Sequence, residues 1–175
     1  GERLVPLQGL GDPGLTELVR EISRLCAVEV DVYVGHKVPG MAAVVAFPRR
    51  MLVLDRSLLG EPEASRRFLL GWALDAIRGG YALLLSLGVR QRRELVALLR
   101  ALVAADSERP AQATEFIDRL PKRVKAAVDR LAGRVGEVDV DEWIDGMVAS
   151  AKRGGLLACN DFAAATRMVA RLAGE

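Results

Sequence analysis

Histidine and cysteine are scarce in this chain of 175 residues, and their scarcity excludes several kinds of site. The sequence holds one histidine, His36, and two cysteines, Cys26 and Cys159. Neither cysteine belongs to a C-x-x-C pair, so no zinc finger or dithiol redox motif is written in the sequence. A Ser-His-Asp set cannot be built convincingly around one histidine. We expect both cysteines to be buried free thiols and His36 to lie solvated in a loop.

Long apolar runs and a strong net charge are also missing. The best candidate for a membrane span, residues 68–87, is interrupted by Asp75, Arg78 and two glycines, so we expect no membrane insertion. A net charge of +2 is too small to favour nucleic acid as a partner. No signal peptide is recognisable, which favours a soluble, cytoplasmic protein, and the arginine-rich composition is typical of GC-rich bacterial genomes. The absence of an initiator methionine favours a segment excised from a longer chain.

The chain is long enough to bury a core, and we predict a single domain of residues 1–175. Strict alternation of valines over Val28–Val34 predicts a half-buried strand, and Met41–Leu54 predicts a β-hairpin. A helix is expected from about residue 13 to 26. A central helix is expected over about 62–78, with Pro62 at its first position. Strands followed by a run of helices predict an α+β fold that is mostly helical, with a small N-terminal sheet packed on the central helix.

The C-terminal half carries further helical patterns. Leucines at helical spacing over 91–105 alternate with outward arginines. The remaining predicted helices cover residues 111–120, 121–131, 139–152 and 160–172, with a linker over 133–138. We expect Gly154 and Gly155 to end or kink the fourth of these five helices. We expect Asn160 to cap the last one.

The stretch Phe68–Tyr81 is the most apolar helical segment of the sequence. Trp72 and Ala76 lie four residues apart, so they share one face of the helix. Zinc peptidases place two metal-binding histidines at this spacing in the motif H-E-x-x-H. The corresponding five residues here are Trp72, Ala73, Leu74, Asp75 and Ala76. None of the motif's catalytic side chains is therefore present.

Three segments of the sequence, taken in order, carry a resemblance to a known family. Met41–Leu54, with Ala46-Phe47-Pro48, is similar to a strand segment containing Ala-x-Pro. Leu70–Ala76 is similar to a helix of the type L-G-H-E-x-x-H, and Tyr81 falls at a later histidine. Val148–Leu157 is similar to the helix pattern E-x-x-A-D-x-x-G-L-L. Together they resemble the zincin-type metallopeptidases, which include the HtpX-like heat-shock proteases, the CAAX prenyl proteases and the mitochondrial inner-membrane proteases.

The resemblance implies that the chemistry of this family has been lost. Trp72 and Ala76 correspond to its histidine ligands, Ala73 to its general-base glutamate, and Val148 to its third ligand. Zinc needs three side-chain donors to leave one position open for water, and hydrolysis needs a carboxylate to accept the proton of that water. We therefore expect no catalytic residue, no metal and no cofactor. The same residues would also be ordinary core on any buried helix, so both interpretations predict an indole packed among apolar groups.

We predict a non-catalytic pseudo-peptidase domain that binds a protein or peptide partner. The resembled family holds an extended substrate against an edge strand beside the motif helix. The corresponding edge here is Met41–Phe47, with Phe47, Trp72 and Tyr81 as walls of a peptide site. The alternative is a purely structural terminal domain of a larger protein with no ligand in the former cleft. A metal-dependent hydrolase with atypical ligands is a third possibility, and the sequence indicates neither the partner nor the oligomeric state.

Overall fold

The computed structural model describes residues 4–38, 41–45, 49–86, 89–104, 109–135 and 139–173. The chain groups into two compact units, Gly1–Ser86 with Met147–Glu175, and Leu87–Gly146. The single domain of residues 1–175 stays a prediction.

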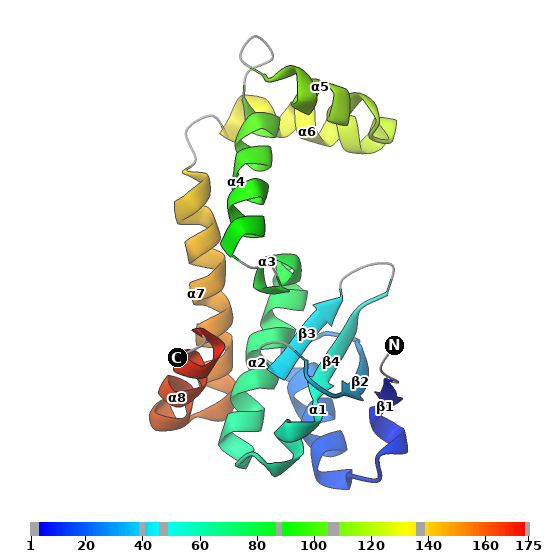
Figure 1. The fold of residues 1–175 in the computed structure, drawn as a ribbon, viewed down its shortest axis with the longest axis vertical. Coiled ribbons are helices and arrows are strands. Elements are labelled where there is room, and N and C mark those ends of the chain that lie inside the picture. The colour runs from blue at the N-terminus through cyan, green and yellow to red at the C-terminus, as the bar shows by residue number, and fades with distance from the viewer. Residues whose placement is uncertain are drawn as a thin grey trace. The chain divides into compact units, whose positions relative to one another are not determined.

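The first unit contains a four-stranded mixed sheet in the order β1-β2-β4-β3 (Figure 1). β2 and β4 are parallel, while the two outer pairs are antiparallel. The strands are β1 (Val5–Pro6), β2 (Asp31–Gly35), β3 (Ala42–Val45) and β4 (Met51–Asp55). The predicted hairpin is confirmed, because Ala42 lies opposite Leu54 and Val45 opposite Met51. The α+β class is likewise confirmed.

The alternating valines do bury one face, but β2 begins at Asp31 rather than at Val28. The reason is the end of the preceding helix, α1 (Pro13–Cys26). Its C-cap, Ala27, adopts the left-handed conformation with φ 52°, and the Val28 amide donates to the carbonyl of Ser23 at 2.9 Å. Residues 28–30 of the valine pattern therefore belong to the connection between α1 and β2 and not to the strand. The strand β1 was not predicted, because two residues are too few to show a period.

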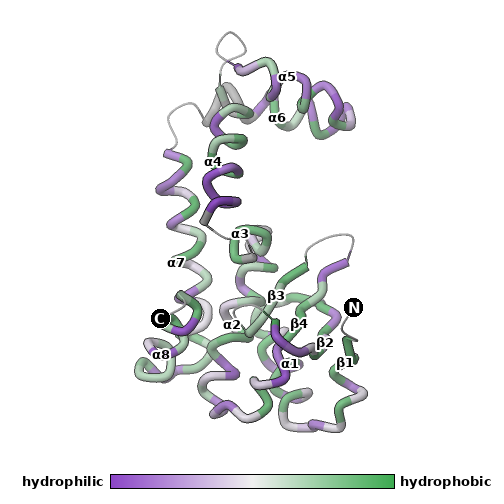
Figure 2. The backbone as a smooth tube through the Cα atoms, viewed as in Figure 1, coloured by the Kyte–Doolittle hydropathy of each residue, from purple (hydrophilic) through white to green (hydrophobic). Residues whose placement is uncertain are grey.

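One face of the sheet forms the core together with α1 and α2 (Glu63–Gly79). The strand residues of this face are all buried: Val32, Val34, Ala42, Val44, Leu52 and Leu54. Figure 2 colours these strands mainly as hydrophobic. α1 packs against α2, and Arg67 of α2 reaches Glu21 of α1 with two hydrogen bonds of 2.9 and 3.0 Å. The fold is thus a sheet layer on a helix layer.

The predicted central helix is confirmed as α2, which is preceded by the 3₁₀ helix Arg56–Gly60 and followed by α3 (Ala82–Ser86). Pro62 is its N-cap, not its first helical residue as we expected. Every residue from Phe68 to Ile77 is buried. Gly80 ends the helix with φ 76°, a conformation that favours glycine.

The prediction for the fourth of the later helices was wrong at its C-terminal end. α7 (Val140–Cys159) does not stop or break at Gly154 and Gly155 but continues through both. The cap of α8 (Phe162–Ala173) was also misplaced, since the Asp161 carboxylate accepts from the Ala164 amide at 2.9 Å. Asn160 instead has φ 49° just after the end of α7, a position where asparagine is tolerated.

The glycines of α7 are needed because α2 lies against them. A Cβ built on Gly155 would lie 2.8 Å from the carbonyl oxygen of Phe68, and one on Gly154 would lie 2.7 Å from Cβ of Asp75. From the other helix, a Cβ on Gly71 would lie 2.4 Å from Cβ of Ala158. The two backbones therefore approach as closely as glycine permits, and this contact outweighs the cost of glycine inside a helix.

The second unit is helical. It contains α4 (Val89–Val103), α5 (Ala111–Asp118), α6 (Lys122–Val135) and the first turns of α7. α4 contacts both α5 and α6. The predicted linker over 133–138 was wrong for residues 133–135, which belong to α6; residues 136–138 lie outside the described part. Asp139 caps α7 as expected, accepting from the amide of Asp141 at 2.9 Å.

We predict that Gly71→Ala destabilises the first unit by about 1–2 kcal/mol, because overpacking costs about 1–3 kcal/mol and the better helix propensity of alanine returns up to about 1 kcal/mol. Urea unfolding, followed by fluorescence, measures this change. A Trp143→Phe background leaves Trp72 of α2 as the only indole reporter.

Gly60→Ala is the matched control, since a Cβ on Gly60 meets nothing within 4 Å. It should be neutral or slightly stabilising. Equal unfolding midpoints for the Gly71→Ala and Gly60→Ala chains would contradict the close helix contact.

Candidate functional site

The residues that correspond to the resembled zinc motif are buried on α2. Trp72 is 7% exposed, and Ala73 and Ala76 are 0% exposed. All three belong to the core formed with the sheet and α1. The Trp72 indole therefore packs among apolar groups, as predicted. The small exposed fraction of Trp72 leaves little surface for a peptide to touch.

Val148 lies on α7 and is half-buried. It occupies the same side of this helix as Gly155, two turns or about 10 Å further toward the N-terminus. Gly155 touches α2 at Phe68. Val148 therefore faces the side of α7 that packs on α2. Its closeness to Trp72 and Ala76, which the resemblance implies, stays a prediction.

Tyr81 and Phe47 were the other expected walls of a peptide site. The ring of Tyr81 folds back over Gly79, and its hydroxyl donates a hydrogen bond to Asp75. Phe47 lies outside the described residues, as do its neighbours in the Ala-x-Pro segment. A peptide contact by Trp72 or Tyr81 thus stays a prediction. Most of the Trp72 side chain is buried in the core, and the Tyr81 hydroxyl is bound to Asp75.

Asp75 is the polar centre of this region, and the sequence analysis did not select it. It is 9% exposed, and it accepts hydrogen bonds from Arg78 at 2.6 Å and from the Tyr81 hydroxyl. Burial, followed by the hydrogen bond to Asp75, raises the pKa of Tyr81. The spacing of Asp75, Arg78 and Tyr81 could have suggested this network, because residues three apart on a helix are neighbours.

The residues at the motif positions do not fit a zinc ion. An indole, two methyl groups and an isopropyl group offer no donor atom, and the nearby Asp75 carboxylate is already bound by Arg78 and Tyr81. Within the described part of the chain, no three or more His, Cys, Asp or Glu side chains are grouped to hold a metal. His36 is exposed on the loop after β2.

Asp55 fixes the loop that leads from β2 to β3. Its carboxylate accepts from the Val38 amide at 2.7 Å and from the Ser57 amide at 2.8 Å and hydroxyl at 2.6 Å. The hydrogen bond from Ser57 is the main reason that the pKa of Asp55 is lowered. A side chain at the end of β4 thereby positions both the loop before the edge strand and the first turn after β4.

β3 forms one edge of the sheet. The amide of Asp31 donates to the carbonyl of Arg50, which fixes the direction of every backbone group in the parallel pair. Combined with the β3–β4 register, this places the peptide groups of Ala43 and Val45 toward β4 and those of Ala42 and Val44 outward. α3 contacts β3, and Val45 at the end of the strand is 37% exposed.

Comparisons with protein families, curated proteins and solved structures find no match to this chain. Among the described residues, no helix combines the length and apolar character needed to cross a bilayer.

We predict that Tyr81→Phe lowers the free energy of unfolding by about 1.5–3 kcal/mol at neutral pH, the usual contribution of a hydrogen bond to a charged group. The raised pKa of Tyr81 in the folded chain means that its contribution is present below about pH 10, the unfolded value, and is lost as the pH rises toward the folded value. The stability difference from wild type should thus shrink in alkali. Urea unfolding between neutral and alkaline pH measures it.

Tyr33→Phe is the control for loss of a phenolic hydroxyl, since no hydrogen bond of the Tyr33 side chain occurs within the described residues. A Tyr81→Phe chain whose stability matches wild type at neutral pH would refute the network around Asp75.

We predict that Asp55→Ala destabilises the chain by about 0.5–2 kcal/mol, the range for loss of a helix cap. Because the pKa of Asp55 is lowered on folding, its stabilisation is present above the unfolded value of about 3.9 and is lost as the pH falls through the folded value. Unfolding measured at neutral and acidic pH should show the two chains converging in acid. Ser57→Ala keeps the hydrogen bonds from the Val38 and Ser57 amides to Asp55, so it should destabilise the chain less. Equal destabilisation by Asp55→Ala and Ser57→Ala would argue against the contact between Asp55 and the Val38 amide.

Proposed function

We propose that this chain is a non-catalytic protein-binding module that pairs an extended segment of a partner with the edge strand β3. The observation that carries the proposal is the outward direction of the peptide groups of Ala42 and Val44 at the sheet edge. An unpaired edge is a ready template for another strand, and the added hydrogen bonds need no particular side chain.

The arrangement around β3 supports a degenerate zincin-like origin for this module. β3 lies between β2 and β4 in sequence but at the edge of the sheet in space, and β4 leads through the 3₁₀ helix Arg56–Gly60 to α2. In the family that the chain resembles, an edge strand beside the motif helix holds the substrate. The apolar residues Trp72, Ala73 and Ala76 at the motif positions support binding without hydrolysis.

A purely structural terminal domain is the second candidate, and one contact favours it. α3 lies against β3, so part of the edge is occupied by the chain itself. A partner strand requires room beside Ala42 and Val44 that α3 does not fill.

Val44→Pro tests the proposal, because it removes an outward N–H while leaving the hydrogen bonds to β4 in place, and proline is tolerated on edge strands in this orientation. Peptides selected against the whole chain from a random display library should shift the NMR amide signals of Ala42 and Val44. Their affinity should fall by about tenfold in the Val44→Pro chain, the loss that corresponds to about one hydrogen bond.

Two results would refute the proposal. One is a selection that enriches no peptide, and the other is a peptide whose shifts spare β3. The urea midpoint of the Val44→Pro chain, read from Trp72, confirms that the variant is folded; Ala43→Pro, which removes an amide directed at β4, should unfold instead.

A further inference from the structure

A groove lies along the opposite edge of the same sheet, between α1 and β2. Its volume is about 570 Å³. Leu7 closes one end, α1 contributes Val19, Ser23 and Arg24, and the strand side is formed by Val30 and Val32. None of these residues belongs to the site described above. The groove has apolar valines at its floor and charged residues at its rim.

The groove exists because β1 is too short to cover β2. β1 pairs only with Tyr33 and Val34, and Pro6 then leads into the 3₁₀ helix Leu7–Gly9. The Asp31 amide points to β4, so the carbonyl of Val30, on the other side of the same planar peptide, points away from β4. By the same alternation the N–H and C=O of Val32 point toward β1, and the pairing of Pro6 with Tyr33 places the Leu7 amide on the Val32 carbonyl, because proline has no N–H to donate. The β1–β2 register does not extend to Val30, so within the described residues the Val30 carbonyl has no strand partner.

A side chain in the groove also lacks a partner. The Ser23 hydroxyl oxygen is buried, and no described residue forms a hydrogen bond with it. A buried hydroxyl that has lost water without gaining a partner is unfavourable. Because this oxygen has almost no accessible surface, a bound chain reaches it only after the surrounding side chains move.

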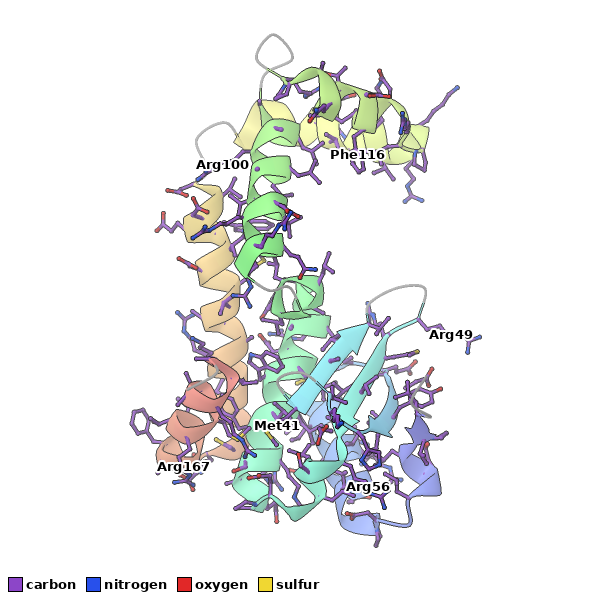
Figure 3. The ribbon with its side chains drawn as sticks, in the orientation of Figure 1. Met41, Arg49, Arg56, Arg100, Phe116 and Arg167 are labelled. Atoms are coloured by element: carbon purple, nitrogen blue, oxygen red, sulfur yellow. The ribbon has the colours of Figure 1, made fainter. Side chains whose placement is uncertain are left out.

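Charge indicates the kind of chain that fits. A second hollow shares Glu29 and Val30 with the groove and continues past Arg49 and Arg50. Together the two hollows are lined by four arginines, Arg20, Arg24, Arg49 and Arg50, against the acids Glu29 and Asp31. Arg20 is paired with Glu17, but no ion pair in the described part involves the other three arginines. The Arg49 side chain extends outward from the start of β4 (Figure 3).

We propose that the groove between α1 and β2 binds an extended acidic peptide segment of a partner protein. A backbone N–H of the segment donates to the Val30 carbonyl. Its apolar side chains enter between Leu7, Val19 and Val30, and its carboxylates face Arg24 and the arginines before β4. This site is independent of the one proposed at β3, because it uses the other edge of the sheet.

An acetylated, amidated peptide of alternating Glu and Val, labelled with fluorescein, is the probe. It should bind the whole chain in fluorescence anisotropy and shift the amide signals of Val30 and Val32 in NMR. Arg24→Glu should weaken binding by about tenfold or more, because reversal of a charge replaces attraction by repulsion. Arg167→Glu, at an exposed arginine on α8 (Figure 3), is the matched control and should leave the affinity unchanged.

Three results would overturn the proposal. They are no binding up to about 1 mM peptide, equal affinity for the Arg24→Glu chain, and undiminished binding of a peptide whose valine amides are methylated. The last result would mean that charge alone holds the peptide. The Val44→Pro chain separates the two sites, since it should bind this probe as wild type does whether or not β3 binds a partner.

Discussion

The contact between the backbones of α2 and α7 is the constraint on which the first unit depends. Gly71, Gly154 and Gly155 leave no room for a Cβ at this crossing. α7 and α8 cover the side of α2 that the sheet and α1 do not reach, so α2 is buried all round from Phe68 to Ile77. An interior helix of this kind must be apolar, and its one acid must find its partners nearby. Asp75 does so through Arg78 and Tyr81.

This burial also bears on the positions that correspond to the resembled zinc motif. A water-activating site needs donor atoms and an open position, whereas Trp72, Ala73 and Ala76 fill their surroundings with carbon. The two proposed sites therefore lie elsewhere on the unit. They use the outward peptide groups of β3 and the Val30 carbonyl before β2.

The sequence predicted those elements whose pattern is local. Alternating valines, the apolar run of α2 and the hairpin over 41–54 were all recognised, because periodicity reports which face is buried. The glycine pair of α7 was misread, since glycine breaks a helix by propensity but serves a close helix contact here, and only the position of α2 distinguishes these cases. The groove could not be predicted either. Thr16, Arg20, Ser23 and Arg24 form a polar flank on α1. Whether this flank borders a groove depends on where β1 stops, which the sequence does not show.

The two edges differ in chemistry, and this difference decides what each can recognise. Backbone hydrogen bonds are the same for every sequence, so selectivity along an edge must come from the side chains beside it. Near β3 these neighbours are Ala42, Val44 and the helix α3, which favour an apolar segment that avoids steric overlap with α3. Along β2 they are arginines around a valine floor, which favour alternating acidic and apolar residues. The two proposed sites would therefore select different segments, because charge beside one edge excludes what apolar packing beside the other accepts.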